Sequence, residues 1–294
     1  MNGNSLFPWK IWGSRFLRKS LYLSILASVR QQHLGVMVSK LRALEPDLSN
    51  QEPTFKAGYD AFLELKIRGV QAFQVSAMLD VVARLNNERA KNTPAPLLVV
   101  DIGDSAGTHM FYLKKILQDI PVQTLSVNLD PRAIVEIRKR NLEALLCRAE
   151  NLDVNQYKVD FYTSFEMMEH LHDPTRFLRN LSKGPNGKYL LVTVPYLKSS
   201  RVGLHSIRKN LNQKVYAQEE HIFELSPTDW SLLMQHAGWK SIWSKIYYQY
   251  PRGLPIVSGV LKKIWQSCDY EGFWCCLLVR DRSHMENYAD WEDC

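Results

Sequence analysis

The stretch that most constrains the fold runs from Leu97 to His109 and reads LLVVDIGDSAGTH. Its apolar start is short and partly β-branched, which is typical of a strand buried on both faces. The run ends in Asp101, and a helical pattern begins at Thr108, where free backbone amides favour an anionic group. Small residues between them let a ligand approach the backbone: Gly103, Ser105 and Gly107. The stretch therefore predicts a strand, a turn and a helix that together form a ligand site.

From this point onward, apolar runs alternate with helical patterns. The predicted strands are 97–101, 122–128, 145–148, 159–164, 189–194, 242–248 and 273–279. The first two are followed by predicted helices over 108–119 and 131–140. This alternation predicts an α/β fold, a Rossmann-like, mostly parallel sheet of seven strands with helices on both faces.

The residues before this region show helical rather than strand periodicity. Apolar residues recur at helical spacing from about residue 14 to 30 and again over 55–87, with a polar loop at 46–53. A Pro-containing linker follows at 92–96. We therefore expect a helical N-terminal segment over 1–92 and an α/β domain over 93–294.

Composition limits the class of protein. With 46% hydrophobic and 23% charged residues, the chain is globular rather than disordered. No apolar run is long enough to cross a membrane, and the first residues lack the pattern of a signal peptide. Five cysteines without metal-type spacing are expected to be free thiols in a reducing compartment, which favours a cytoplasmic location.

The chain is basic, with a net charge of +7. Residues 1–50 carry seven Lys and Arg but only two acids, and residues 1–30 interleave these cations with aromatic side chains. Such a segment can contact an anionic membrane surface peripherally, bind a polyanion such as RNA, form a lid over a substrate, or simply present a solvated helix face. The sequence leaves these alternatives open.

The glycine spacing indicates which ligand the turn after Asp101 binds. A dinucleotide fingerprint reads G-x-G-x-x-G, whereas this chain reads Asp-x-Gly-x-Ser-x-Gly with the acid first, which disfavours a nicotinamide-dependent oxidoreductase. The pattern resembles motif I of the class I S-adenosylmethionine-dependent methyltransferases, with Ser105 where that family has glycine. The resemblance implies that residues 101–107 bind the amino-acid end of S-adenosylmethionine, and that the last strand of the sheet is antiparallel.

Three later segments extend the resemblance across roughly residues 95–280. The family's ribose-binding acid falls on Asn128, with Asp130 as the alternative two residues later. The run 148–152 resembles the adenine segment Asp-Ala-Glu-x-Leu, with Arg148 in place of its Asp, so Glu150 or a backbone carbonyl would accept instead. The segment 160–174, which includes Phe165, resembles the family's segment that borders cofactor and substrate.

This last segment also holds the candidate catalytic groups. Glu166, Glu169 and His170 are spaced so that a helix would place them on one face. Together with His221 they resemble the Glu-x-x-Glu-His and distant His of small-RNA 3′-end methyltransferases and ubiquinone-pathway O-methyltransferases, which implies a possible divalent metal held by all four. Alternatively, Glu169 and His170 only orient the loop, and His170 or His221 acts as a general base.

The sequence thus predicts an S-adenosylmethionine-dependent methyltransferase that acts on oxygen. A small molecule, a glycan or a lipid-linked acceptor would each fit. Two alternatives remain: an RNA-end methyltransferase that uses a divalent metal, and a methyltransferase-fold binding protein with impaired activity, which Arg148 would explain.

Overall fold

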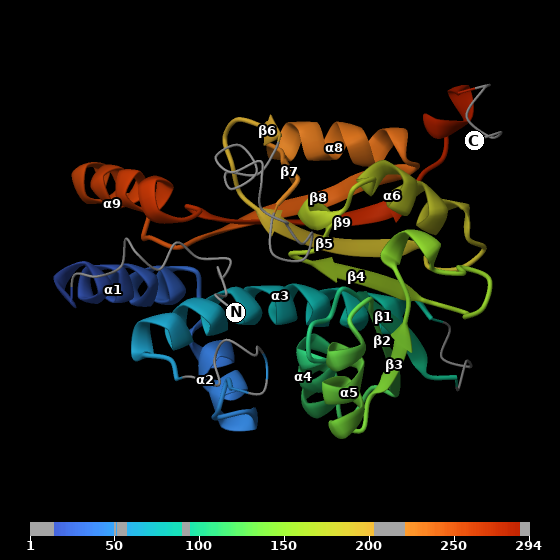
Figure 1. Ribbon diagram of the computed structural model, residues 1–294, viewed down its shortest axis with the longest axis horizontal. Helices are drawn as coiled ribbons and strands as arrows, with labels where there is room; N and C mark the ends of the chain where they lie inside the picture. Colours follow the sequence, from blue (N-terminus) through green and yellow to red (C-terminus); the bar gives the residue numbers. More distant parts are fainter. Residues whose placement is uncertain (1–14, 50, 52–57, 90–94, 203–220, 289–294) are drawn as a thin grey trace, which may run out of the picture.

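The computed structural model describes residues 15–49, 51, 58–89, 95–202 and 221–288. Its centre is a seven-stranded sheet with the order β3-β2-β1-β4-β5-β9-β8 (Figure 1). The strands are β1 (Leu97–Ile102), β2 (Val122–Asn128), β3 (Glu143–Leu146), β4 (Phe161–Phe165), β5 (Tyr189–Pro195), β8 (Trp239–Tyr248) and β9 (Gly272–Arg280). The first five pair in parallel, and β9 is antiparallel to both of its neighbours. The predicted fold class, including the antiparallel last strand, is confirmed.

Helices cover both faces of this sheet (Figure 1). One face carries α6 (Pro174–Lys183) and α8 (Pro227–His236). The other carries α1 (Arg15–Gln31), α2 (Gly35–Leu44), α3 (Ala61–Glu88), α4 (Thr108–Ile116), α5 (Pro131–Lys139) and α9 (Pro255–Cys268). Neighbouring residues of one strand enter opposite cores, as Leu190 and Leu191 of β5 do, because side chains alternate along a strand. This double burial explains why the sequence shows apolar runs here rather than alternation.

Strand bounds differ from the prediction mainly at the edges of the sheet. Residues 122–128 form β2 as predicted, but β3 lies two residues earlier than predicted, and β8 begins three residues earlier. Both β3 and β8 are edge strands. The largely exposed β8 carries no continuous apolar run, and β3 begins at the polar Glu143, which pairs with Leu125 of β2.

The N-terminal helices are built into the domain core. Leu21, Ile25 and Val29 of α1 are buried in the same cluster as α3 and the sheet. The expectation that this segment only makes external contacts is therefore wrong for the inner side of α1.

Helix α2 was not predicted. The aromatic residues before Ser14 lie outside the described residues, and the boundary at residue 92 stays a prediction. No helix in the described part of the chain combines the length and apolarity needed to span a bilayer.

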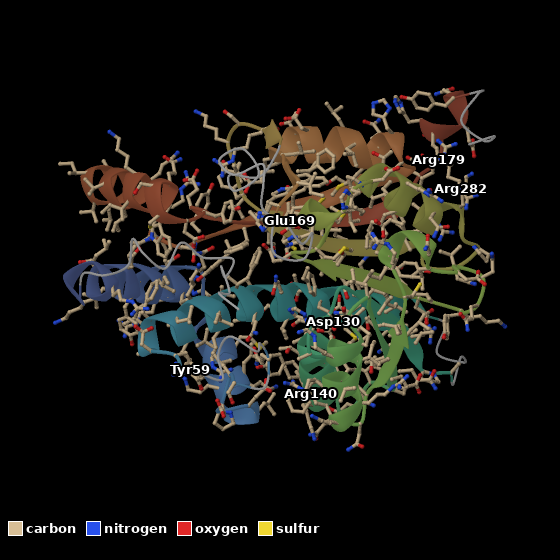
Figure 2. The ribbon with its side chains drawn as sticks, in the orientation of Figure 1. Tyr59, Asp130, Arg140, Glu169, Arg179 and Arg282 are labelled. Atoms are coloured by element: carbon tan, nitrogen blue, oxygen red, sulfur yellow. The ribbon has the colours of Figure 1, made fainter. Side chains whose placement is uncertain are left out.

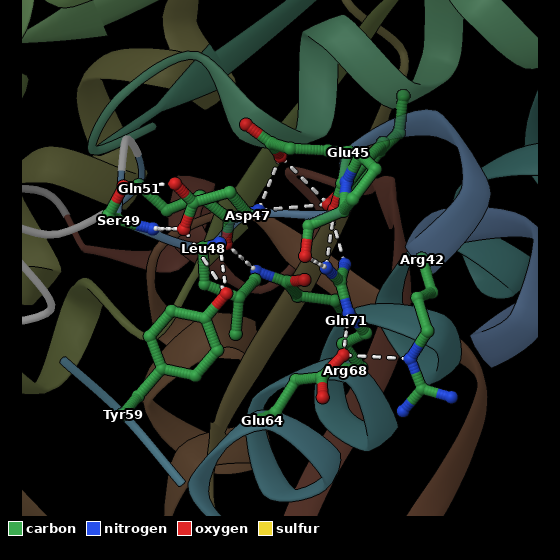
Figure 3. Close-up of polar contacts among 12 residues, drawn as sticks. Arg42, Glu45, Asp47, Leu48, Ser49, Gln51, Tyr59, Glu64, Arg68 and Gln71 are labelled. Atoms are coloured by element: carbon green, nitrogen blue, oxygen red, sulfur yellow. Dashed lines mark hydrogen bonds and ion pairs between the residues drawn. The ribbon is translucent and has the colours of Figure 1, made fainter. Parts of the chain in front are cut away.

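A buried polar network fastens the loop after α2 to the rest of the domain (Figure 3). The fully buried guanidinium of Arg68 in α3 donates to the backbone carbonyl of Glu45 and contacts Glu64 at 3.1 Å. The Glu45 carboxylate accepts from Tyr112 of α4 at 2.9 Å and pairs with Arg140 at 2.8 Å. One loop thus joins α3, α4 and the end of α5 through charged hydrogen bonds, which are strong when desolvated.

Replacing Arg68 by Ala is expected to lower the free energy of unfolding by about 3 kcal/mol, because it leaves buried partners unpaired. Urea unfolding followed by circular dichroism measures the change. Arg84→Ala is the matched control, since Arg84 forms an exposed i,i+4 pair with Glu88 on the same helix; its unfolding midpoint should not change. Equal effects of the two substitutions would contradict the role assigned to Arg68.

Candidate active site

The turn after β1 is shaped by two glycines with left-handed backbone. Gly103 has φ +94° and Gly107 has φ +74°, conformations that side chains rarely tolerate. A Cβ on Gly103 would lie 2.5 Å from Cγ of Met167, which belongs to the loop after β4. Ser105 between them is exposed. The turn therefore exposes Ser105 and packs directly against the loop that carries Glu169.

Two acids and an imidazole lie beneath this turn. Asp101 and Asp104 are buried, and Nδ1 of His109 lies 3.3 Å from Asp101 Oδ2 and 3.6 Å from Asp104 Oδ1. Thr163 of β4 donates to Asp101 at 2.8 Å, and Ser126 of β2 donates to Asp104 at 3.0 Å. The acids of the turn are thus held by both strands that flank β1.

His109 carries the compensating charge. Burial lowers its pKa, but the adjacent Asp101 and Asp104 outweigh burial and raise the pKa to about 9. Because the ring is then protonated at neutral pH, Nε2 donates to Gln74 Oε1 at 3.0 Å, and Gln74 donates to Thr193 Oγ1 of β5 at 2.8 Å. For Asp101, burial and the nearby Asp104 raise the pKa. A chain of polar contacts therefore joins the turn to α3 and to β5.

The two candidate ribose-binding residues are engaged in the turn after β2. Asn128 donates to the backbone carbonyl of Asp104 at 3.2 Å and accepts from the backbone amide of Asp130 at 2.9 Å. Asp130 caps α5 by accepting from the amide of Arg132, and it pairs with the Arg132 side chain at 2.8 Å (Figure 2). Asn128 is thus directed towards the glycine turn, and Asp130 towards its own helix.

The remaining candidate cofactor residues lie along the same edge of the sheet. Glu150 sits in a 3₁₀ turn, η3 (Ala149–Asn151), and its largely buried carboxylate is 3.5 Å from the exposed Arg148 guanidinium. Phe165 ends β4, is buried, and meets the ring of His109 edge-on at 4.6 Å between centroids. Phe165 therefore contacts the acids of the turn through His109.

Three of the four candidate metal ligands meet. One possible ligand atom from each of Glu169, His170 and His221 lies within 4.8 Å of the others, and the two imidazoles are 4.6 Å apart between centroids. Glu169 is placed at the carboxyl end of β4, near the middle of the molecule (Figure 2). The backbone carbonyl of Glu169 accepts from the amide of Ile222 at 2.7 Å, which fixes the loop of His221 beside it.

Glu166 is not part of this group, and its predicted place on a common helix face is wrong. Only Met168–His170 forms a helical turn, the 3₁₀ helix η4, and Glu166 has φ +51°. Its backbone amide donates to the carbonyl of Thr193 at 2.9 Å, which continues the pairing of β4 with β5. The chain therefore turns sharply at Glu166 before Glu169 and His170 are reached.

Both acids of this loop are buried. Burial raises the pKa of Glu166 to about 8, opposed by a hydrogen bond from Thr193 and by the charge of His109. Burial and the neighbouring Glu166 raise the pKa of Glu169 well above its ordinary value. Neither carboxylate oxygen of Glu169 has a hydrogen-bond partner among the described residues. A fully buried acid without partners is costly, so this carboxyl group favours either a proton or an added cation.

A second layer of residues orients His221. Its ring stacks on Tyr270 at 5.5 Å, and its Nδ1 lies 2.7 Å from the Tyr270 hydroxyl and 3.3 Å from Glu224 Oε1. The Tyr270 hydroxyl donates to Glu224, and Arg201 pairs with the other oxygen of this carboxylate. Burial opposes ionisation of Glu224, but His221, Arg201 and Tyr270 outweigh it and lower the pKa of Glu224 to about 2.

Several of these residues were not among the predicted site residues. His109 lies within the motif itself, but nothing in the sequence shows that its ring turns inward to the acids. Tyr270 and Arg201 join the site from distant segments without any motif, and only the fold brings them to His221. Glu224 follows His221 by three residues, and this short spacing is the one sequence signal that could have placed it beside the imidazole.

The comparisons with known proteins agree with this geometry. The model of a methyltransferase domain family matches residues 71–244. A protein assigned as a sarcosine dimethylglycine methyltransferase from Galdieria sulphuraria has 11% identity and a TM-score of 0.52, over 74% of this chain and 88% of that one. Magnesium protoporphyrin IX methyltransferase from Synechocystis PCC 6803, with bound SAH, has 13% identity and a TM-score of 0.50, over 82% and 96%.

A search of curated proteins gave no match. The family match covers more than half of the chain, and the two structures share its fold. The chain therefore belongs to the methyltransferase domain family and is a class I S-adenosylmethionine-dependent methyltransferase.

Proposed function

We propose that this protein transfers a methyl group to an oxygen atom of a small-molecule, glycan or lipid-linked acceptor. The observation that carries the proposal is the group formed by Glu169, His170 and His221, with His221 backed by Tyr270 and an ionised Glu224. Hydroxyl acceptors need a base, because a neutral hydroxyl is a poor nucleophile. The imidazole of His221, held beside the loop that follows β4, supplies that base.

The residues around the glycine turn fit S-adenosylmethionine. The exposed Ser105 lies between the two left-handed glycines, so a ligand can reach the turn there, and the start of α4 offers amides to the methionine carboxylate. We assign Asp101 and Ser105 to the amino-acid end, Asn128 with Asp130 to the ribose, and Glu150 to the adenine, and Phe165 borders the amino-acid end through His109. The bound cofactor supplies an electrophilic methyl group, and transfer then depends on alignment of the acceptor.

The proton count supports His221 as the base. Glu224 is ionised, so the single proton of the Tyr270 hydroxyl goes to that carboxylate. The Tyr270 oxygen then accepts a hydrogen bond from His221, which places a proton on Nδ1. Nε2 of His221 is left with its lone pair, and His170 lies edge-on to the same ring. The acceptor hydroxyl would give its proton to Nε2.

The cofactor assignment predicts that Gly103→Ala weakens binding of S-adenosylmethionine at least about tenfold, since the new Cβ collides with Met167 and fills the turn. Calorimetric titration measures the affinity. Gly253→Ala is the matched control, because Gly253 has a similar φ of +87° but no atom within 4 Å of its Cβ position. Unchanged affinity in Gly103→Ala, or an equal loss in both variants, would refute the assignment.

The base assignment predicts that His221→Gln lowers methyl transfer about a hundredfold or more while cofactor affinity stays the same. Transfer is measured with labelled S-adenosylmethionine and a panel of catechols, sugars, polyprenol-linked lipids and RNA 3′ ends. His236→Gln is the control, since His236 also contacts a tyrosine, Tyr288, but outside the site. A product methylated on nitrogen or carbon would contradict the proposal, and so would full activity of His221→Gln.

A divalent metal is the second candidate, favoured by the unpartnered carboxylate of Glu169. One carboxylate and two imidazoles form a sound donor set. Because His221 donates a hydrogen bond from Nδ1 to Tyr270, its Nε2 is free for a metal. Glu169, His170 and His221 would hold the ion, which when bound lowers the pKa of a coordinated hydroxyl. Glu166 would not be a ligand.

Metal binding predicts a contrast between the two acids of the loop. Titration calorimetry with Mn²⁺ and Zn²⁺ is expected to show one site that Glu169→Gln abolishes, because this change removes the only carboxylate ligand. Glu166→Gln should retain the site with affinity reduced by less than about tenfold, because it changes only a neighbouring charge. If neither ion binds the unmodified protein, or if Glu166→Gln also abolishes binding, the metal hypothesis fails and the base mechanism remains.

A further inference from the structure

Helix α9 presents an apolar surface that the catalytic site does not use. Its carboxyl half is anchored, since Trp265 and Cys268 are buried and the Trp265 indole donates to Ser24 of α1 at 3.1 Å. The amino half shows the opposite pattern. Its exposed apolar side chains, with their exposed fractions, are Leu254 (53%), Ile256 (83%), Val257 (52%) and Val260 (54%).

These four residues, here called the α9 patch, form a cluster. Eleven large apolar side chains are exposed in the described part of the chain, and four of them fall within these seven residues. Ile256 and Val260 are one helical turn apart, and Val257 lies beside them. Scattered exposed apolar residues are ordinary on a soluble surface, but a contiguous cluster on one projecting helix marks an interaction surface.

The charged residues that flank the α9 patch in the sequence are all basic. From Gln249 to Cys268 the chain has no acidic residue, but it has Arg252, Lys262 and Lys263. Lys262 is 3.7 Å from the buried carboxylate of Glu271, and Lys263 is exposed. An apolar patch flanked by cations, without acids, complements the negative surface and apolar interior of a membrane that contains anionic lipids.

The neighbouring helix α1 extends this positive surface. It lies beside α9 (Figure 1), joined through Ser24 and through Gln31, which exchanges two hydrogen bonds with the backbone of Arg252. Helix α1 has no acidic residue, and Lys19 and Arg30 are exposed. A second copy of this chain is disfavoured as the occupant, because a symmetric contact would bring the two basic surfaces together.

We propose that the α9 patch docks this protein on the surface of an anionic membrane. The apolar residues enter the boundary between headgroups and acyl chains, and Arg252 and Lys263 contact the phosphates. This docking is independent of which acceptor is methylated.

Co-sedimentation with vesicles tests the proposal. The full chain is expected to bind vesicles of phosphatidylcholine with phosphatidylserine, and to bind phosphatidylcholine alone much more weakly. Ile256→Ser with Val260→Ser should lower binding to the anionic vesicles at least about tenfold, because two apolar side chains are lost from the interface. Lys263→Gln should lower it about fivefold and weaken its salt dependence.

The matched control is Val36→Ser with Leu232→Ser, which removes apolar side chains of similar exposure, 83% and 50%, from α2 and α8. It should bind vesicles as the unmodified chain does, and circular dichroism should show both double variants folded. The proposal is overturned if the unmodified chain ignores anionic vesicles, or if the patch variant binds as well as the control. It is also overturned if light scattering shows that the unmodified chain forms a dimer, that the patch variant does not, and that added vesicles leave the dimer unchanged.

Discussion

The contact between Gly103 and Met167 is the constraint on which the site depends. Strands β1 and β4 are parallel neighbours, so the turn after one and the loop after the other leave the sheet at the same edge. They approach so closely that no Cβ fits at Gly103. The position of the glycine turn therefore fixes the position of the loop that carries Glu169 and His170. A substitution at this point would disturb the proposed cofactor site and the proposed catalytic group together.

The same edge of the sheet holds buried charges in two different arrangements. Around the turn, His109 balances the charges of Asp101 and Asp104, and each of these carboxylates also accepts a hydrogen bond, from Thr163 and from Ser126. Around the candidate base, Glu224 is balanced by Arg201, but Glu169 is left without a hydrogen-bond partner in the described part of the structure. Complete networks rigidify a protein, whereas an unbalanced buried acid costs stability. The unbalanced group marks the place where a substrate or a cation would be accommodated.

The sequence alone predicted the elements that depend on local pattern. Strand β2 was placed correctly because Pro121 and Pro131 mark the breaks on either side of it, and the turn at Gly103 and Gly107 follows from spacing that few other structures require. Edge strand β3 was misplaced because its pairing with β2 begins at the polar Glu143, which precedes its apolar residues. The grouping of Glu169, His170 and His221 was also predicted, although from resemblance rather than from local physics.

Other features depend on contacts that no local pattern reports. Glu166 was expected on one helix face with Glu169 and His170, but its amide pairs with β5 and its backbone is left-handed, so it lies outside the helical turn that carries the other two. Tyr270 reaches His221 only because β9 inserts between β5 and β8, which brings the residue before this strand to the site. Such residues are separated by tens of positions in sequence, so spacing cannot indicate them.

The path from α9 to Tyr270 links the proposed membrane surface to the proposed base. The α9 patch begins the helix, and the helix ends at Cys268, two residues before the tyrosine that orients His221. At the rise of an α-helix, Ile256 lies within about 20 Å of this end. A membrane docked at the patch would therefore lie one short helix away from the catalytic group. The proposed membrane surface and the proposed base are thus connected through a single helix, whichever acceptor is methylated.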